Sequence, residues 1–151
     1  MGSIYNVIIV GDAGVGKTAF IRQLLQQSFS AEYEPSIGSS MYEIVMDTIT
    51  INIWDTAGQE KFNPLSLDSS DIHGVLILFD VASMLSFQSV PWWVNKIGCN
   101  INVICGNKCD IQQRKVQSES MPPNSREIST KTGDNVMETL LYLIGQIAGD
   151  D

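Results

Sequence analysis

The chain has 151 residues, 44% of them hydrophobic, and roughly 150 residues suffice to bury one core, so we expect a single domain over residues 1–151. Nine Lys and Arg residues against 17 Asp and Glu give a formal net charge of -8, which argues against a nucleic-acid surface and against attraction to anionic lipid. No stretch approaches the roughly 20 consecutive apolar residues of a membrane span, so we expect a soluble protein.

The first predicted elements are a strand, a helix and a hairpin. Residues 3–10 form a short apolar run, typical of a central strand that is buried on both faces. Residues 17–27 change to a helical spacing of apolar side chains. Residues 41–45 and 49–54 alternate between apolar and polar side chains, which predicts a β-hairpin that ends at Asp55.

Two further apolar runs, residues 74–81 and 102–107, flank a segment with helical spacing at residues 86–97. Pro91 should fall in the first turn of that helix, where the missing backbone N–H removes no helical hydrogen bond. This order is typical of a βαβ unit, whose strands are parallel.

The C-terminal segment predicts a short strand at residues 126–129 and a last helix, with Asn135 and Glu138 as a capping pair at its start. The alternation of strands and helices predicts an α/β domain. It should contain a mostly parallel sheet with helices on both faces, and bind its ligands at the carboxyl ends of the strands.

The cysteines and the two ends of the chain indicate a reducing compartment and no lipid. Cys99, Cys105 and Cys109 are odd in number and show no Cys-x-x-Cys spacing, which favours plain thiols over a disulfide framework or a zinc site. The C-terminal IAGDD offers no cysteine for prenylation, and Asn6 stands where the myristoylation pattern needs Ser or Thr. We therefore expect no lipid anchor.

The segment GDAGVGKT, residues 11–18, matches the pattern Gly-x-x-x-x-Gly-Lys-Thr between a predicted strand and a predicted helix. Glycines let backbone N–H groups converge on phosphates, and the helix N-terminus adds partial positive charge. Lys17 can reach the β- and γ-phosphates, and Thr18 offers its hydroxyl to Mg²⁺. The predicted nucleotide contacts here are Asp12, Ala13, Gly14, Val15, Gly16, Lys17, Thr18 and Ala19.

A second motif, WDTAGQE at residues 54–60, follows the predicted hairpin. Asp55 at the end of its strand can hold Mg²⁺ through water, and the Gly58 N–H can meet a γ-phosphate. The combination of this motif with the glycine loop indicates a nucleoside triphosphate site.

The third and fourth motifs select the base. GNKCD supplies Asn107, Lys108 and Asp110 at the end of another strand. A carboxylate at 110 can accept two N–H bonds from guanine, whereas adenine would oppose it with an acceptor. The last motif, STK, adds Ser129, Thr130 and Lys131 after the final strand, so four separated segments converge on one guanine nucleotide.

With these four motifs together and in order, the chain resembles the small GTPases of the Ras superfamily over nearly its whole length. The resemblance implies a P-loop small GTPase (G domain) fold, a six-stranded mostly parallel sheet with five helices. It also implies GTP and GDP as ligands, Mg²⁺ as cofactor, slow hydrolysis of GTP, and a role as a molecular switch.

The resemblance further implies roles for single residues. Phe29 lies edge-on to the guanine, Tyr33 closes over the phosphates, and Ser36 joins Mg²⁺ when GTP is bound. Gln59 aligns the attacking water. Lys17 is the second implied catalytic residue. The implied metal ligands are Thr18, Ser36 and Asp55. At the base, Lys108 packs on the guanine and the Thr130 N–H meets its O6.

Within the superfamily, the segments GQEKF, FDVAS, SVPWW, GNKCDIQQRKV and REISTKTGDN are most similar to Ran, with Rab second. This similarity implies nuclear or vesicle transport and a monomer in the cytoplasm, the nucleus or both. An exchange factor, an activating protein and effectors are the implied partners.

The chain departs from that pattern at Ser36, where a threonine is usual, and at Ala13, where Ran and Ras carry glycine. Two alternatives to a hydrolysing switch stay open. One is a catalytically weak scaffold that holds its nucleotide and acts as an interaction module. The other is a P-loop small-molecule kinase, which would need a cluster of arginines that the nine basic residues do not form.

Overall fold

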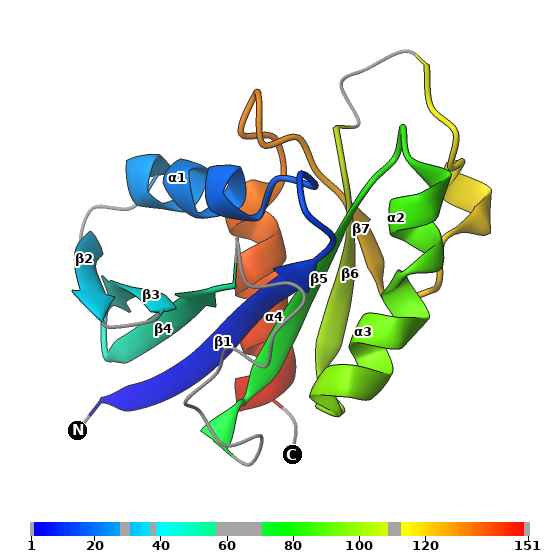
Figure 1. Ribbon diagram of the computed structural model, residues 1–151. Coiled ribbons are helices and arrows are strands. Elements are labelled where there is room, and N and C mark those ends of the chain that lie inside the picture. Colours follow the sequence, from blue (N-terminus) through cyan, green and yellow to red (C-terminus); the bar gives the residue numbers. More distant parts are fainter. Residues whose placement is uncertain (1, 28–30, 37–38, 57–70, 109–112, 150–151) are drawn as a thin grey trace.

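The computed structural model describes residues 2–27, 31–36, 39–56, 71–108 and 113–149 (Figure 1). Its strands are β1 (Ser3–Gly11), β2 (Ala31–Ser36), β3 (Ser39–Met46), β4 (Ile49–Asp55), β5 (Gly74–Asp80), β6 (Asn102–Asn107) and β7 (Ser125–Glu127). Its helices are α1 (Lys17–Gln27), α2 (Met84–Gln88), α3 (Val90–Ile97) and α4 (Val136–Ala148), with a short 3-10 helix at Ser118–Ser120.

These strands form one sheet in the order β2-β3-β4-β1-β5-β6-β7. The pairs β1–β4, β1–β5, β5–β6 and β6–β7 are parallel, whereas β2–β3 and β3–β4 are antiparallel. The α/β fold with a mostly parallel sheet and the predicted β3–β4 hairpin are therefore confirmed.

The sheet has seven strands where the resemblance implies six. The additional strand is β2, which pairs with β3 so that Tyr33 lies opposite Tyr42 and Ser36 opposite Ser39. The sequence of this segment, AEYEPS, shows no apolar alternation and contains Pro35, so its pattern did not predict a strand. An edge strand tolerates proline because half of its backbone N–H groups point away from the sheet.

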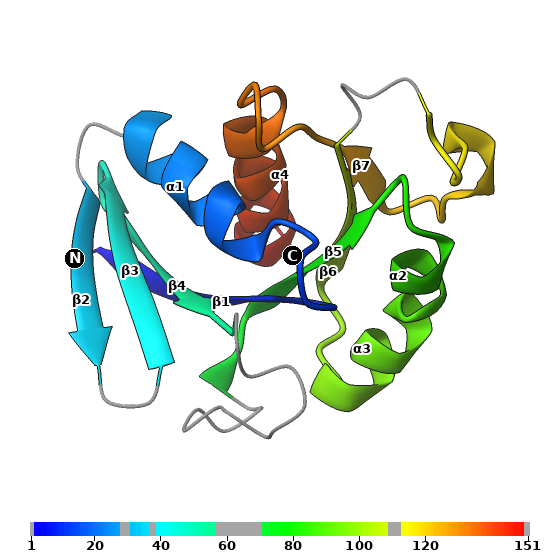
Figure 2. The same ribbon diagram turned by 45° about the horizontal axis from the view of Figure 1, so that its top comes forward.

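Helices cover both faces of the sheet, as predicted (Figure 2). Val7 and Ile9 of β1 are buried in the cluster that contains the apolar side chains of α1 and α4. Ile8 and Val10 are buried in the second cluster, which contains those of α2 and α3. Because successive side chains of a strand point to opposite faces, the uninterrupted apolar run of β1 fits a strand with a core on each side. No helix in the described parts of the chain is long and apolar enough to cross a membrane.

The single helix predicted at residues 86–97 is two helices, α2 and α3, joined at Ser89. Pro91 lies in the first turn of α3, as expected. Because proline has no N–H, Pro91 cannot donate to the carbonyl oxygen of Phe87 four residues earlier. Helix α2 therefore ends at Gln88, before Pro91. The break leaves the Ser89 side chain between the two helices.

The predicted capping pair of α4 is wrong. Asn135 has a left-handed backbone with φ 61°, and its side chain makes no hydrogen bond to the helix N-terminus. This conformation turns the amide back toward β7, where Nδ2 donates to the carbonyl oxygen of Glu127 at 2.9 Å. The Asn135 carbonyl oxygen instead accepts from the N–H and the hydroxyl of Thr139.

Candidate functional site

The segments singled out in the sequence meet at one edge of the sheet, at the carboxyl ends of its parallel strands. The glycine loop follows β1, β4 ends at Asp55, and β6 ends at Asn107. In Figure 1 the loop after β1 and the carboxyl ends of β5 and β6 lie along the upper edge, near the segment between β7 and α4. This is where open α/β sheets bind their ligands.

The glycine loop holds the Lys17 ammonium inside it. Lys17 is the first residue of α1 and is 3% exposed, and its Nζ donates to the carbonyl oxygens of Gly11 at 2.7 Å and Asp12 at 2.9 Å. These contacts keep a charged group at the N-terminus of a helix, where the free backbone N–H groups already favour an anion. The loop therefore has the groups that a phosphate-binding loop needs.

Two glycines of the loop are required by their backbone. Gly14 and Gly16 have φ values of 82° and 107°, in the region that side chains rarely adopt. A Cβ on Gly16 would also overlap Nδ2 of Asn107, whereas one on Gly14 would meet nothing within 4 Å. The close approach of Gly16 is what lets the loop contact β6.

Two of the three predicted metal ligands are in contact with each other. The Thr18 hydroxyl donates to Oδ2 of Asp55 at 2.9 Å, and Asp55 is buried at the end of β4. Hydroxyl and carboxylate oxygens are ligands that suit Mg²⁺, which proteins bind through one or two carboxylates together with substrate phosphates. Among the described residues no group of three or more His, Cys, Asp or Glu side chains could hold a metal ion by itself.

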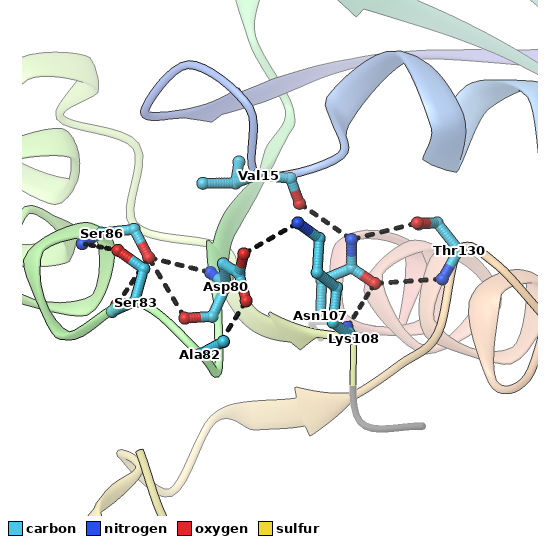
Figure 3. A network of polar contacts seen from close by, with 8 residues as sticks. All are labelled: Val15, Asp80, Ala82, Ser83, Ser86, Asn107, Lys108 and Thr130. Carbon is cyan, nitrogen blue, oxygen red and sulfur yellow. Dashed lines mark hydrogen bonds and ion pairs between the residues drawn. The ribbon is translucent and has the colours of Figure 1, made fainter. Parts of the chain in front are cut away.

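Asn107 joins the glycine loop to the STK segment (Figure 3). Its Nδ2 donates to the carbonyl oxygen of Val15 at 2.8 Å and to the Thr130 hydroxyl at 3.1 Å. Its Oδ1 accepts from the N–H of Thr130 at 3.0 Å and of Lys108 at 2.7 Å. The side chain is 0% exposed, so all of its polar capacity serves to connect the three segments.

Lys108 has a positive φ of 69°, and its ammonium forms an ion pair with Asp80 at 2.8 Å (Figure 3). Asp80 ends β5, and its Oδ1 accepts from the N–H of Ala82 at 2.8 Å. The sequence analysis missed Asp80 as part of the site. The FDVAS segment that contains it was noticed only as a family similarity.

The STK segment is fixed from both sides. Ser129 is buried and its N–H donates to the carbonyl oxygen of Asp134 at 3.1 Å, which closes a tight loop before α4. Gln23 of α1 donates through Nε2 to the carbonyl oxygen of Thr130 at 3.0 Å. Gln23 was also missed, because one glutamine on a helix carries no signal in the sequence.

A third residue that the sequence did not indicate is Thr56, directly after β4. Its buried hydroxyl donates to the carbonyl oxygen of Ile9 at 2.7 Å, which ties the start of the DTAG segment to β1. This bond fixes where the segment leaves the sheet, beside Asp55.

The remaining predicted residues differ in how far the structure describes them. Val15 is buried, Ala19 and Thr130 are half-buried, and Ala13 and Lys131 are exposed. The structure describes the backbone of Tyr33 and Ser36, which lie in β2. Phe29, Gly58, Gln59 and Asp110 lie outside the described residues.

One titratable group in the core has an altered pKa. Burial raises the pKa of the Cys105 thiol far above its ordinary range. Cys105 lies on β6 and its side chain packs among the apolar side chains of α1 and α4, away from the nucleotide segments. It is a core residue with an unreactive thiol.

A buried lysine in a glycine loop, a hydroxyl beside a carboxylate, and an asparagine that joins the loop to two further segments define a P-loop nucleotide-binding domain. The sequence model of the Ras family matches residues 6–148. The chain therefore belongs to the Ras family. Members of this family are small GTPases that bind GTP and GDP with Mg²⁺ and act as molecular switches.

Proposed function

We propose that this chain binds GDP and GTP with Mg²⁺, hydrolyses GTP slowly, and acts as a molecular switch in intracellular transport. The observation that carries the proposal is the Asn107 network. One buried amide joins Val15 of the phosphate loop to Thr130 of the predicted base site, at 2.8 and 3.0 Å. The predicted phosphate-binding and base-binding segments are therefore connected to each other, which supports a single nucleotide that occupies both.

The proposed contacts divide into three groups. The backbone of residues 12–19 and the Lys17 ammonium bind the phosphates. Thr18, Asp55 and Ser36 hold Mg²⁺. The guanine is bound by Phe29, Asn107, Lys108, Asp110, Ser129, Thr130 and Lys131, with Tyr33 and Gly58 at the phosphates.

The proposed chemistry is positioning and electrostatic stabilisation. Lys17 and the loop N–H groups neutralise negative charge that develops on the phosphate oxygens, and Gln59 orients the attacking water. Mg²⁺, when bound, supplies further neutralisation of the β- and γ-phosphates. Turnover by this machinery alone is slow, because an arginine from an activating protein is worth about 10³–10⁵ in rate.

The Ran-like and Rab-like segments support a role in nuclear or vesicle transport. Of the two, we favour the Ran-like role in nuclear transport. On this proposal residues 1–151 form one monomeric domain. An exchange factor, an activating protein and effectors would recognise the segments around residues 33–37 and 56–66, which change with the γ-phosphate.

Nucleotide content and turnover test the proposal together. Nucleotide extracted from purified protein should be GDP or GTP, and loaded GTP should be hydrolysed slowly in a single turnover with Mg²⁺. Gln59→Leu should slow this step at least tenfold, about 1.4 kcal/mol, because the water loses its orienting group. Gln146→Leu is the matched control, since Gln146 is exposed on α4, and it should hydrolyse GTP like the wild type.

Two other outcomes would contradict this proposal. Bound adenine nucleotide would contradict the assignment of Asp110 to guanine. Guanine nucleotide without any hydrolysis, and without an effect of Gln59→Leu, would favour the scaffold that holds its nucleotide.

A further inference from the structure

Asp12 of the phosphate loop is bound by helix α3. Its Oδ2 accepts from the Ser89 hydroxyl at 2.7 Å, and its Oδ1 accepts from Nε1–H of Trp93 at 3.1 Å. Both bonds have a charged acceptor, which makes them stronger than hydrogen bonds between neutral groups. The carboxylate thus serves a contact with α3, while the backbone of the same residue belongs to the loop.

The two donors are presented by a rigid part of the molecule. Val90 and Trp93 are 4% and 5% exposed and belong to the cluster that packs α3 against the sheet. Ser89 stands at the break between α2 and α3, where its hydroxyl also contacts the carbonyl oxygen of Leu85 at 3.1 Å. The position of α3 therefore determines the position of the Asp12 carboxylate.

The two loop residues directly after Asp12 have little support of their own. Gly11 is fixed by the pairing of β1 with β5, opposite Leu78. Ala13 and Gly14 are exposed, and a Cβ on Gly14 would meet no heavy atom within 4 Å. The α3 contact is thus placed where the chain leaves the sheet and begins the loop.

The same residue also touches the phosphate-binding lysine. The carbonyl oxygen of Asp12 accepts from Nζ of Lys17 at 2.9 Å. A shift of Asp12 would therefore move a partner of the ammonium as well as the N–H groups that follow in the loop.

We propose that Asp12 is a positioning residue through which Ser89 and Trp93 of α3 hold the phosphate loop in its binding conformation and slow the release of nucleotide. The proposal rests on the nucleotide binding proposed above. It gives α3, which has no predicted contact with the nucleotide, a direct effect on how long the nucleotide stays bound.

The test is the rate at which tritiated GDP leaves the full chain in the presence of Mg²⁺ and excess unlabelled GDP. Asp12→Asn, Ser89→Ala and Trp93→Phe each remove a partner of the contact, and we expect release to accelerate about tenfold, the equivalent of about 1.4 kcal/mol. Ser89→Thr keeps the hydroxyl and should restore the wild-type rate.

The matched control is Trp92→Phe. Trp92 neighbours Trp93 with ring centroids 4.8 Å apart, but it is 53% exposed and its ring faces Lys96. It has no hydrogen bond to Asp12 in the described structure, so this variant should release GDP like the wild type.

A double-mutant cycle separates positioning from general destabilisation. If Ser89 acts through Asp12, Ser89→Ala should accelerate release much less in the Asp12→Asn background than in the wild type. Unchanged release in all three single variants, full additivity in the cycle, or failure of Ser89→Thr to rescue would overturn the inference alone. Failure of the wild type to retain GDP would overturn the proposed function and this inference with it.

Discussion

At the scale of single residues, Gly16 lies where the phosphate loop packs against Asn107 of the predicted base-binding segments. A methyl group there would overlap the Asn107 amide, and the backbone φ of 107° is unfavourable for any side chain. Gly14 has a comparable φ of 82° but open space around it. The pair therefore separates the cost of backbone strain from the cost of displacing Asn107.

We expect both Gly14→Ala and Gly16→Ala to lower the free energy of unfolding of the nucleotide-free protein, by about 1–3 kcal/mol for the strained backbone. Gly16→Ala should cost about 1–3 kcal/mol more, because buried polar groups around Asn107 lose their partners. Urea unfolding of the two variants measures the difference. Equal midpoints and slopes for the two variants would show that the Asn107 contact contributes nothing.

At the scale of elements, α1 connects the two ends of the predicted nucleotide site. Its first residues are Lys17 and Thr18, and its Gln23 donates to the carbonyl oxygen of Thr130 at 3.0 Å. One turn later Gln27 donates to the carbonyl oxygen of Gly133 at 3.2 Å. Residues four apart lie on one face of a helix, so this face of α1 follows the STK segment.

Gln23→Leu leaves an apolar side chain that is one heavy atom shorter, and it removes the donor to Thr130. We expect GDP to leave this variant about two- to tenfold faster, since a neutral hydrogen bond contributes about 0.5–1.5 kcal/mol. Release of labelled GDP measures the effect. Gln26→Leu, an exposed position on the same helix, is the control, and equal release from both variants would contradict the role given to Gln23.

At the scale of the whole molecule, the sheet separates two cores, and the predicted nucleotide segments follow the carboxyl ends of its strands, with Val15 of the loop buried in the core beneath α1 and α4. Cys105 is fully buried in the core beneath α1 and α4, and this burial raises the pKa of its thiol. The thiol pKa is thus higher in the folded state than in the unfolded state. Its contribution to stability is fully present below the ordinary thiol pKa of about 8.5 and is lost as the pH rises above that value.

We therefore expect the free energy of unfolding to fall above about pH 8.5, with Cys105 contributing up to about 1.36 kcal/mol per pH unit. Cys105→Ala should be less stable at pH 7, because it leaves a small cavity, but should lose less stability between about pH 8 and 10. Denaturant unfolding across this range compares the two slopes. Parallel plots of unfolding free energy against pH for wild type and variant would mean that the thiol ionises as easily in the folded state as in the unfolded state.

Much of the fold was predictable because its determinants are local. The apolar run of β1, the helical spacing of α1 and the alternation of β3 and β4 each reflect a burial pattern that a short stretch of sequence repeats. Where local signals were weak or misleading, the prediction failed. β2 has no apolar alternation, and Asn135 looked like a cap although its left-handed backbone turns the side chain toward β7.

The sequence by itself predicted the chemistry of the site: a phosphate loop, a hydroxyl and a carboxylate suited to Mg²⁺, and residues suited to a guanine, each marked by residue type and short spacing. Only the tertiary structure decided how these groups are held. Asp12 meets Trp93 across 81 positions of sequence, Asn107 meets Val15 across 92, and Gln23 meets Thr130 across 107. Such pairs leave no periodic signal in one sequence, because they depend on which ends of parallel strands the sheet brings side by side.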